Sequence, residues 1–373
     1  MAKHIYVHIP YCEAKCPYCS FFSVTDKSRE EMLFDSMERD VRSYKGFIDE
    51  NDDTRDSVYF GGGTPSFASP SLICGLLFEI RRVFEIGEDA EITIEVNPNS
   101  LTEDLAARYR RAGFNRISVG VQSLHDDVLR TLGRLHNGEG AEEALKICGR
   151  AGFTNISADL IIGVPGQRRE DAVRDADVLI SLGVKHISMY SLSIEEGTEF
   201  EKRYGDDPES YFPEETEREM YHGLRTHLKE KGIFPYEISN CAYKGYESVH
   251  NSSYWRGCDY VGIGPGAVGF LKGKRIRGVE DIGRYIASPT DKITDEVVGE
   301  EDRVKEYAML MLRMTEGIDR AEFKRKFKRD PDEVFGEAIK ANLLRGLIES
   351  DERGIRLTSK GTDLANIVSE DFL

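Results

Sequence analysis

The sequence has no long hydrophobic run and no recognisable leader. No apolar stretch reaches the roughly 18 residues that a membrane-spanning helix needs, and the start, Met-Ala-Lys-His-Ile, is neither a signal peptide nor a transit peptide. We therefore predict a cytoplasmic protein without a transmembrane segment. Its seven cysteines are expected in a reducing compartment, where thiols bind metals rather than form disulfides.

The chain also lacks an excess of positive charge. It carries 67 acidic and 50 basic residues, for a formal net charge of −17. A field of this sign disfavours nucleic acids and anionic membrane surfaces as partners. We therefore expect no nucleic-acid partner.

The sequence also lacks the two pairs of closely spaced cysteines that are common in structural zinc sites. Cys12, Cys16 and Cys19 lie within eight residues, directly after an apolar segment. The other four cysteines are isolated: Cys74, Cys148, Cys241 and Cys258. Structural zinc sites usually have four protein ligands, commonly in two pairs. Thiolates also hold iron–sulfur clusters, and a cluster held by three cysteines would keep one iron open. The triplet favours such a cluster, with zinc and merely buried or disulfide-bonded cysteines as the open alternatives.

The first two hundred residues alternate between short β-branched segments and amphipathic stretches. Strands are predicted at residues 5–9, 57–60, 91–96, 116–121, 156–162 and 186–192. Helices are predicted at residues 29–48, 70–84, 103–112, 125–132, 140–151 and 170–182. This order predicts a parallel sheet with helices outside it, either doubly wound or a barrel. Chemistry-capable residues follow every strand, which favours a barrel.

The chain has 373 residues, which is more than a single hydrophobic core usually holds. Its composition also changes after residue 199. We predict a barrel domain over residues 1–205, an extension over 206–300 and a C-terminal domain over 301–373. A helix is predicted at 214–231. Helices at 302–314, 320–327 and 332–344, followed by a β-hairpin at 347–357 with its turn near 351–354, indicate an α+β winged-helix-like unit. Its candidate recognition helix lacks a clear excess of positive charge.

Glycines and carboxylates mark the predicted strand ends. Gly61, Gly62 and Gly63 follow the second strand, where the missing side chains let a ligand approach the backbone. Glu95 and Asp159 lie in apolar strands, and a buried carboxylate is costly unless it is paired or bound. These two residues are therefore either ligand-binding groups or members of structural ion pairs.

The cysteine motif and the segments HIPYC, FGGGTP, IEVNP, RISVGVQS and ADLIIGVPGQ together resemble the radical S-adenosylmethionine (SAM) superfamily, in its oxygen-independent coproporphyrinogen III oxidase-like branch. The resemblance implies an α/β fold with an incomplete (β/α)6 barrel. It also implies a [4Fe-4S] cluster on Cys12, Cys16 and Cys19, with SAM at the open iron. The SAM contacts that it implies are Tyr6, Tyr18, Gly62, Gly63, Thr64, Glu95, Gln122, Arg134, Asp159, Ser191 and Val268.

Two features distinguish the chain within this branch. Phe21 stands where the oxidase has a further cysteine, and the chain contains His250-Asn-Ser-Ser-Tyr254-Trp255. This HNxxYW motif resembles that of the HemW heme chaperones. The resemblance implies that His250, Tyr254 and Trp255 handle heme, although a lone histidine beside aromatic residues is more often structural.

The likeness to the HemW proteins implies heme as a ligand and a client hemoprotein, such as a respiratory enzyme, as a partner. It also implies a homodimer, and it assigns no catalytic residue. The alternative is a catalytic radical-SAM enzyme acting on a tetrapyrrole, as in porphyrin biosynthesis. Whether the protein is an enzyme therefore stays open at this point.

Overall fold

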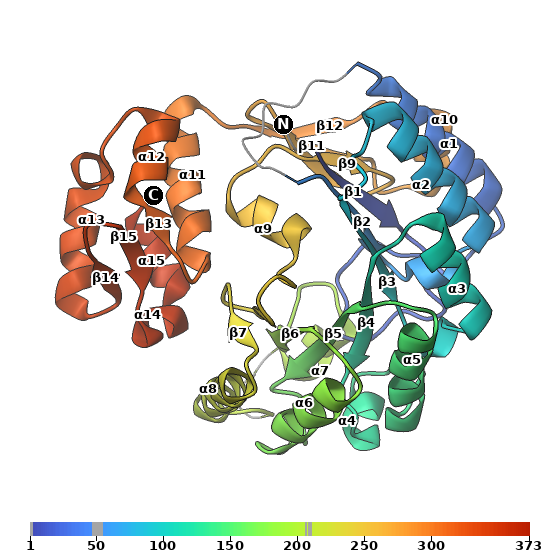
Figure 1. Ribbon diagram of the computed structural model, residues 1–373, viewed down its shortest axis with the longest axis horizontal. Helices are drawn as coiled ribbons and strands as arrows, with labels where there is room; N and C mark the ends of the chain where they lie inside the picture. Colours follow the sequence, from blue (N-terminus) through green and yellow to red (C-terminus); the bar gives the residue numbers. More distant parts are fainter. Residues whose placement is uncertain (1–2, 47–54, 206, 208–210) are drawn as a thin grey trace.

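A curved nine-stranded sheet forms the centre of the protein (Figure 1). The computed structural model describes residues 3–46, 55–205, 207 and 211–373. The sheet has the order β7-β8-β6-β5-β4-β3-β2-β1-β9. Its strands are β1 (His4–Ile9), β2 (Ser57–Gly62), β3 (Glu91–Val96), β4 (Arg116–Gln122), β5 (Asn155–Ile162), β6 (His186–Ser191), β7 (Phe234–Pro235), β8 (Asn240–Ala242) and β9 (Val261–Ile263). The six strands predicted from the sequence are β1 to β6.

The strand order identifies the sheet as part of a barrel. Strands β1 to β6 are neighbours in chain order and all parallel, whereas a doubly wound sheet reverses its order at a switch point. Strand β9 adds to the free edge of β1 in parallel, and β8 adds to β6 in the antiparallel direction. The predicted incomplete barrel is therefore confirmed.

Helices cover the outer face of this sheet (Figure 1). They are α1 (Glu30–Ser43), α2 (Pro70–Phe84), α3 (Glu103–Ala112), α4 (Asp126–Thr131), α5 (Gly138–Arg150) and α6 (Asp171–Ser181). Local signals set their ends. The Thr102 side chain accepts a hydrogen bond from the Leu105 amide at 3.2 Å, and Gly113 follows α3 with φ 106°. Helix α1 ends earlier than predicted, at Ser43, and the last residues of the predicted helix, 47 and 48, lie outside the described residues.

A mixed region connects the barrel to the C-terminal domain. It contains α7 (Glu199–Tyr204), α8 (Glu214–Glu230), α9 (Val249–Trp255) and α10 (Ile282–Ala287), with the antiparallel sheet of β10 (Val268–Leu271), β11 (Lys274–Arg277) and β12 (Ile293–Val297). Helix α9 lies between the barrel and the C-terminal domain (Figure 1). The predicted domain boundary at 205 and 206 falls partly outside the described residues, which lack 206 and 208–210.

The C-terminal domain packs five helices against a small sheet. Its elements are α11 (Glu300–Arg313), β13 (Ile318–Asp319), α12 (Arg320–Phe327), α13 (Pro331–Arg345), β14 (Ile348–Ser350), β15 (Gly354–Leu357), α14 (Ser359–Asp363) and α15 (Ala365–Asp371). The predicted hairpin is β14–β15, and the Asp351 carboxylate closes its turn by accepting from the amides of Arg353 and Gly354 at 2.8 and 3.0 Å. The winged-helix-like arrangement is thus confirmed.

Two large hydrophobic cores and a smaller cluster around Val128 and Phe200 support this architecture in the described residues. The first large core fills the space between the barrel strands and their helices, and the second lies inside the C-terminal domain around Tyr307, Phe323 and Ile355. Trp255, at the end of α9, packs against the second core. In the described parts of the chain, no helix is long and apolar enough to cross a membrane.

Candidate cluster and cofactor site

The cysteine loop and the carboxyl ends of the barrel strands line one cavity of about 440 Å³. Parallel strands bring their carboxyl ends to the same edge, so residues far apart in the sequence meet there. Most of the site residues predicted from the sequence line this cavity: Cys12, Cys16, Tyr18, Cys19, Gly62, Gly63, Thr64, Glu95, Gln122, Arg134, Asp159 and Ser191. The structure therefore brings them to one place.

Backbone hydrogen bonds hold the cysteine loop in a fixed shape. The Cys12 amide donates to the Val24 carbonyl at 3.0 Å, and the Val24 amide donates to the Pro10 carbonyl at 2.7 Å. The Cys19 amide donates to the Cys16 carbonyl at 3.1 Å. The loop thus returns beside its own start, and all three thiols are partly exposed on the cavity wall.

The glycines at the end of β2 leave no room for a side chain. A Cβ atom on Gly63 would lie 2.8 Å from the Tyr11 carbonyl oxygen and 3.1 Å from the Cys12 sulfur. Gly62 has φ 106°, a conformation that other residues rarely adopt. The Gly63 amide donates to the Ile9 carbonyl at 2.8 Å, which fixes this segment against the start of the cysteine loop.

The two strand carboxylates differ from ordinary surface acids. Burial raises the pKa of Glu95 to about 7, against the hydrogen bond that Tyr59 donates to its Oε1 at 2.6 Å. The charge of Asp159 raises the same pKa further. Burial also raises the pKa of Asp159, although Ser118 donates to it at 3.4 Å. Both groups therefore hold a proton more readily than in water, and a cation entering the cavity would favour their ionised forms.

Arg134 places a positive charge beside the cysteine loop. Its Nη2 donates to the Asn97 Oδ1 at 2.7 Å and to the Gly120 carbonyl at 3.0 Å, and its Nη1 lies 3.6 Å from the Cys16 sulfur. This position for a cation matches the negative charge expected of a thiolate-bound cluster.

The donor set fits a [4Fe-4S] cluster with SAM beside it. Burial raises the pKa of the Cys19 thiol, and the nearby Cys16 and Cys12 raise it further because three thiolates crowd one another. Cationic iron would relieve this crowding. Within the described ranges, no group of three or more His, Cys, Asp or Glu side chains converges closely enough to hold a single metal ion.

Sequence reasoning missed several residues of the cavity wall. Arg116, Ser118 and Ser188 also line it. In a strand every second side chain faces the same way. Arg116 and Ser118 therefore share a face of β4 with Gly120 and Gln122, which also line the cavity. The alternation of side chains along β4 predicts Arg116 and Ser118 as wall residues, whereas their distance from the strand end does not.

Two predicted contacts lie elsewhere. Tyr6 and Val268 are absent from the cavity wall. The Tyr6 hydroxyl is 3.1 Å from the His8 Nδ1, and Val268 pairs with Arg277 in the sheet of β10 and β11.

The HNxxYW motif enters the barrel from the amino ends of the strands, and its Asn251 lines the cofactor cavity. The His250 Nδ1 is 2.8 Å from the Ser57 hydroxyl, and its Nε2 is 2.7 Å from the Tyr254 hydroxyl. The His250 amide donates to Glu91 at 3.1 Å. Ser57 and Glu91 begin β2 and β3, so His250 anchors α9 to the amino ends of the strands. The side chain is 1% exposed, and both ring nitrogens have partners.

The other two motif residues face the C-terminal domain. Tyr254 and Trp255 line a second cavity, and the Trp255 ring lies 4.4 Å from the Arg313 guanidinium carbon. The structure thus separates the three predicted heme residues into one anchor inside the barrel and two aromatic side chains on a cavity wall.

Comparison with family models finds two separate matches along the chain. The radical SAM superfamily model matches residues 6–179, and the HemN C-terminal domain model matches residues 298–364. The first match covers β1 to most of α6, which includes the cysteine loop. The second covers most of the C-terminal domain.

Whole-chain comparison finds similar proteins and a similar structure. The heme chaperone HemW of Lactococcus lactis is 33% identical over 99% of this chain and 96% of that protein. The heme chaperone HemW of Bacillus subtilis is 34% identical over 100% of this chain and 99% of that protein. Coproporphyrinogen III oxidase (HemN) from Escherichia coli superposes with a TM-score of 0.81 at 21% identity, covering 100% of this chain and 90% of that one. At that identity the last likeness shows the fold alone.

Proposed function

The chain belongs to the HemW family of the radical SAM superfamily, and from this membership we propose that it is a heme chaperone. It binds a [4Fe-4S] cluster, SAM and heme, and it transfers the heme to a client hemoprotein. The observation that carries this proposal is the similarity to HemW proteins along nearly the whole chain. The cavity lined by three thiols, glycines and strand-end carboxylates supports it.

Each part of the cavity has a role in this proposal. Cys12, Cys16 and Cys19 hold the cluster, and Arg134 balances its negative charge. The backbone at the end of β2, with Gly62 and Gly63, admits the amino-acid end of SAM, and the ionised Glu95 and Asp159 accept hydrogen bonds from its ammonium or ribose hydroxyls. When bound, the cluster and SAM supply one-electron chemistry.

We propose a cytoplasmic location and a hemoprotein client, with a respiratory enzyme as our candidate. The protein acts as a homodimer in this proposal. Size-exclusion chromatography of the reconstituted protein tests the dimer, because the native mass would be twice that of the 42.2 kDa chain.

Anaerobic reconstitution with iron and sulfide tests the function. We expect the full chain to take up a [4Fe-4S] cluster, to bind heme in a fixed stoichiometry, and to pass heme to an apo-hemoprotein without consuming SAM. Substrate-dependent release of 5′-deoxyadenosine together with a modified porphyrin would instead support the catalytic alternative. Failure to bind heme at all would remove the chaperone proposal.

Cysteine variants provide the matched control. Replacing Cys12, Cys16 and Cys19 by alanine should abolish the cluster absorbance and the bound iron. Cys74→Ala changes a partly exposed cysteine on α2, on the outside of the barrel, and should leave the iron content unchanged. Equal iron loss in both proteins would contradict the assigned ligands.

A further inference from the structure

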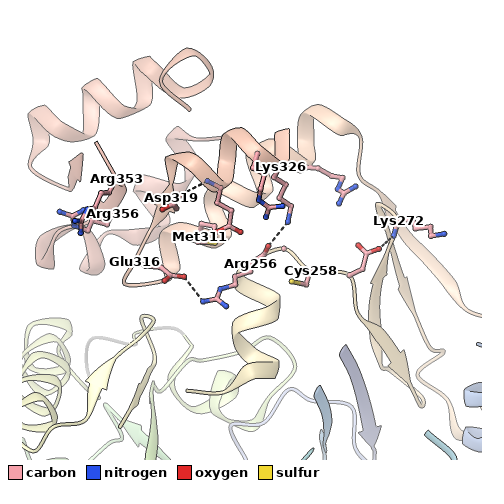
Figure 2. Close-up of a pocket in the computed structure, with 15 residues that line it drawn as sticks. Arg256, Cys258, Lys272, Met311, Glu316, Asp319, Lys326, Arg353 and Arg356 are labelled. Atoms are coloured by element: carbon pink, nitrogen blue, oxygen red, sulfur yellow. Dashed lines mark hydrogen bonds and ion pairs between the residues drawn. The ribbon is translucent and has the colours of Figure 1, made fainter. Parts of the chain in front are cut away.

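A wide cleft separates the C-terminal domain from the end of α9 and the β10–β11 hairpin. Its volume is about 920 Å³, within the range of about 300 to 1,000 Å³ typical of ligand sites. Figure 2 shows Arg256 at the end of α9, Cys258 in the loop that follows, and Lys326 opposite them in the C-terminal domain. Two hydrogen bonds cross this cleft: Arg256 donates to Glu316 at 3.1 Å, and Lys326 donates to the Arg256 carbonyl at 3.3 Å.

An aromatic cavity of about 250 Å³ opens beside the cleft. The two spaces share the wall residues Gly257, Cys258, Arg303 and Lys326. The aromatic residues on the smaller cavity are Tyr254, Trp255, Tyr260, Phe270, Tyr307 and Phe327. Together the spaces form one site with an aromatic inner part and a polar outer part, the arrangement that suits a flat ligand with apolar faces and a charged edge.

The outer part is basic although the protein is acidic. Seven basic and four acidic side chains line the cleft, whereas the whole chain has a net charge of −17. Arg303 lies on both spaces, and its guanidinium has no hydrogen bond or ion pair within the described part of the chain. A local excess of cations in an acidic protein indicates an anionic ligand.

Two buried hydrogen-bond donors in the aromatic cavity lack acceptors. Tyr307 is 2% exposed, and its hydroxyl has no partner among the described residues. The same holds for the indole nitrogen of Trp255. Buried polar atoms are normally satisfied, and a ligand with acceptor atoms in this cavity would satisfy both donors.

Cys258 places a sulfur atom where the two spaces meet. Its amide donates to the Ser253 carbonyl at 3.0 Å, which holds the loop against α9. Gly257, just before it, has φ 61° and lies against the Tyr307 ring, with a Cβ position 3.5 Å from that ring. A cysteine thiolate is one of the few protein groups that hold heme iron.

We propose that heme binds in this site, with its ring among the aromatic side chains, its propionates toward Arg303 and Lys326, and Cys258 as an axial ligand of the ferric iron. The thiol loses its proton to solvent as the sulfur–iron bond forms. The inference rests on the proposed heme-chaperone function and adds the binding site to it. It also gives the HNxxYW motif two tasks: His250 anchors α9, while Tyr254 and Trp255 form the wall.

Titration of the reconstituted full chain with ferric heme tests the site. We expect the wild type to show the absorption and electron paramagnetic resonance spectra of thiolate-ligated ferric heme. Cys258→Ser should lose this signature and weaken binding by about tenfold or more. Arg303→Ala should weaken binding by about twofold to fivefold and keep the signature. Metal-free protoporphyrin should bind Cys258→Ser and wild type equally.

Two control variants make the outcomes distinguishable. Cys74→Ser and Arg174→Ala change residues on the outer helices α2 and α6 and should bind heme as the wild type does. If the wild type binds no heme, the proposed function fails. If the wild type binds heme but Cys258→Ser and Arg303→Ala match it in affinity and spectrum, this site is wrong while the proposed function stands. Circular dichroism and iron content identify any variant that misfolds.

Discussion

Glu95 is a carboxylate whose protonation depends on what occupies the cavity. Burial raises its pKa to about 7, and Tyr59 donates a hydrogen bond to it at 2.6 Å. A cationic ligand would lower that pKa again. At neutral pH the carboxyl is therefore close to its midpoint, and a cation bound beside it would favour the ionised form.

The stability of the protein without cofactor should report this proton. Because the folded-state pKa of about 7 lies above the ordinary value of 4.5, the contribution of Glu95 is fully present below about pH 4.5 and is lost as the pH rises through 7. The loss amounts to roughly 3 kcal/mol at most. Glu95→Gln removes this titrating carboxyl. We therefore expect the stability of the variant relative to wild type to rise between pH 5 and pH 8. Denaturant unfolding at several pH values measures the unfolding free energies of both proteins. A difference between them that stays constant with pH would contradict the raised pKa of Glu95.

Gly63 tests the close contact between β2 and the cysteine loop. In Gly63→Ala the new Cβ would lie 2.8 Å from the Tyr11 carbonyl oxygen, 2.9 Å from the Ile9 carbonyl oxygen and 3.1 Å from the Cys12 sulfur, so the surrounding backbone must shift. We expect a loss of roughly 1 to 3 kcal/mol in unfolding free energy, with reduced iron content after reconstitution. Gly75→Ala is the matched control: it has no heavy atom within 4 Å and lies within α2. Equal iron content in the two variants would contradict the contact.

Helix α9 connects the cofactor cavity with the aromatic cavity. The Tyr59 hydroxyl bonds to Glu95 in the cofactor cavity, and the Tyr59 ring stacks on His250 with centroids 5.2 Å apart. His250 in turn bonds to the Tyr254 hydroxyl, and Tyr254 lines the aromatic cavity. This contiguous chain of side chains offers a route by which cofactor binding could alter the heme site.

Removal of the His250 ring should loosen α9 without disturbing the cluster. His250→Ala loses two side-chain hydrogen bonds and the stack on Tyr59, so we expect about 2 to 4 kcal/mol lower stability and weaker heme binding with unchanged iron content. Burial lowers the pKa of His250 well below 6.5, so its contribution is present above that value and lost as the pH falls. The variant should therefore be less acid-sensitive.

An exposed histidine gives the comparison for this variant. His222→Ala changes a side chain on α8 that is 37% exposed and that contacts Asp363 at 2.8 Å, and it should alter neither the iron content nor heme binding. Iron assay and heme titration measure these two properties, and denaturant unfolding measures the stability of both variants. Iron loss in His250→Ala would show that the anchor and the cluster loop are coupled, against the separation seen here.

The charge of the whole molecule opposes the charge of the proposed heme site. A dianionic ligand would be repelled by a protein of net charge −17, so added salt should strengthen binding if no local cations were involved. At a basic cleft added salt should instead weaken binding, because salt screens the attraction between the ligand and Arg303 with its neighbouring cations. We expect heme affinity to fall as the ionic strength rises from about 0.05 M to about 0.5 M. Titrations at fixed pH measure this, and rising affinity would exclude the cleft.

Most of the fold was accessible from local patterns. The helix at Pro70–Phe84 was predicted to the residue, because a proline opens it and its apolar residues repeat at helical spacing. The end of α1 at Ser43 was missed, because the amphipathic pattern continues beyond it in the sequence. Of the cofactor cavity, Arg116 and Ser118 were missed because they lie inside β4 and not at its end.

The cysteine loop, the order of strands and helices, and the family can be read from the residues in line, since they depend on spacing along the chain. The enclosure of His250 at the amino ends of the strands and the position of Cys258 between two cavities depend on the folded chain. Burial and hydrogen bonding join segments that are far apart in the sequence, and Ser57 and His250 are 193 residues apart. No local pattern of the motif specifies which of its side chains faces a core and which faces a cleft.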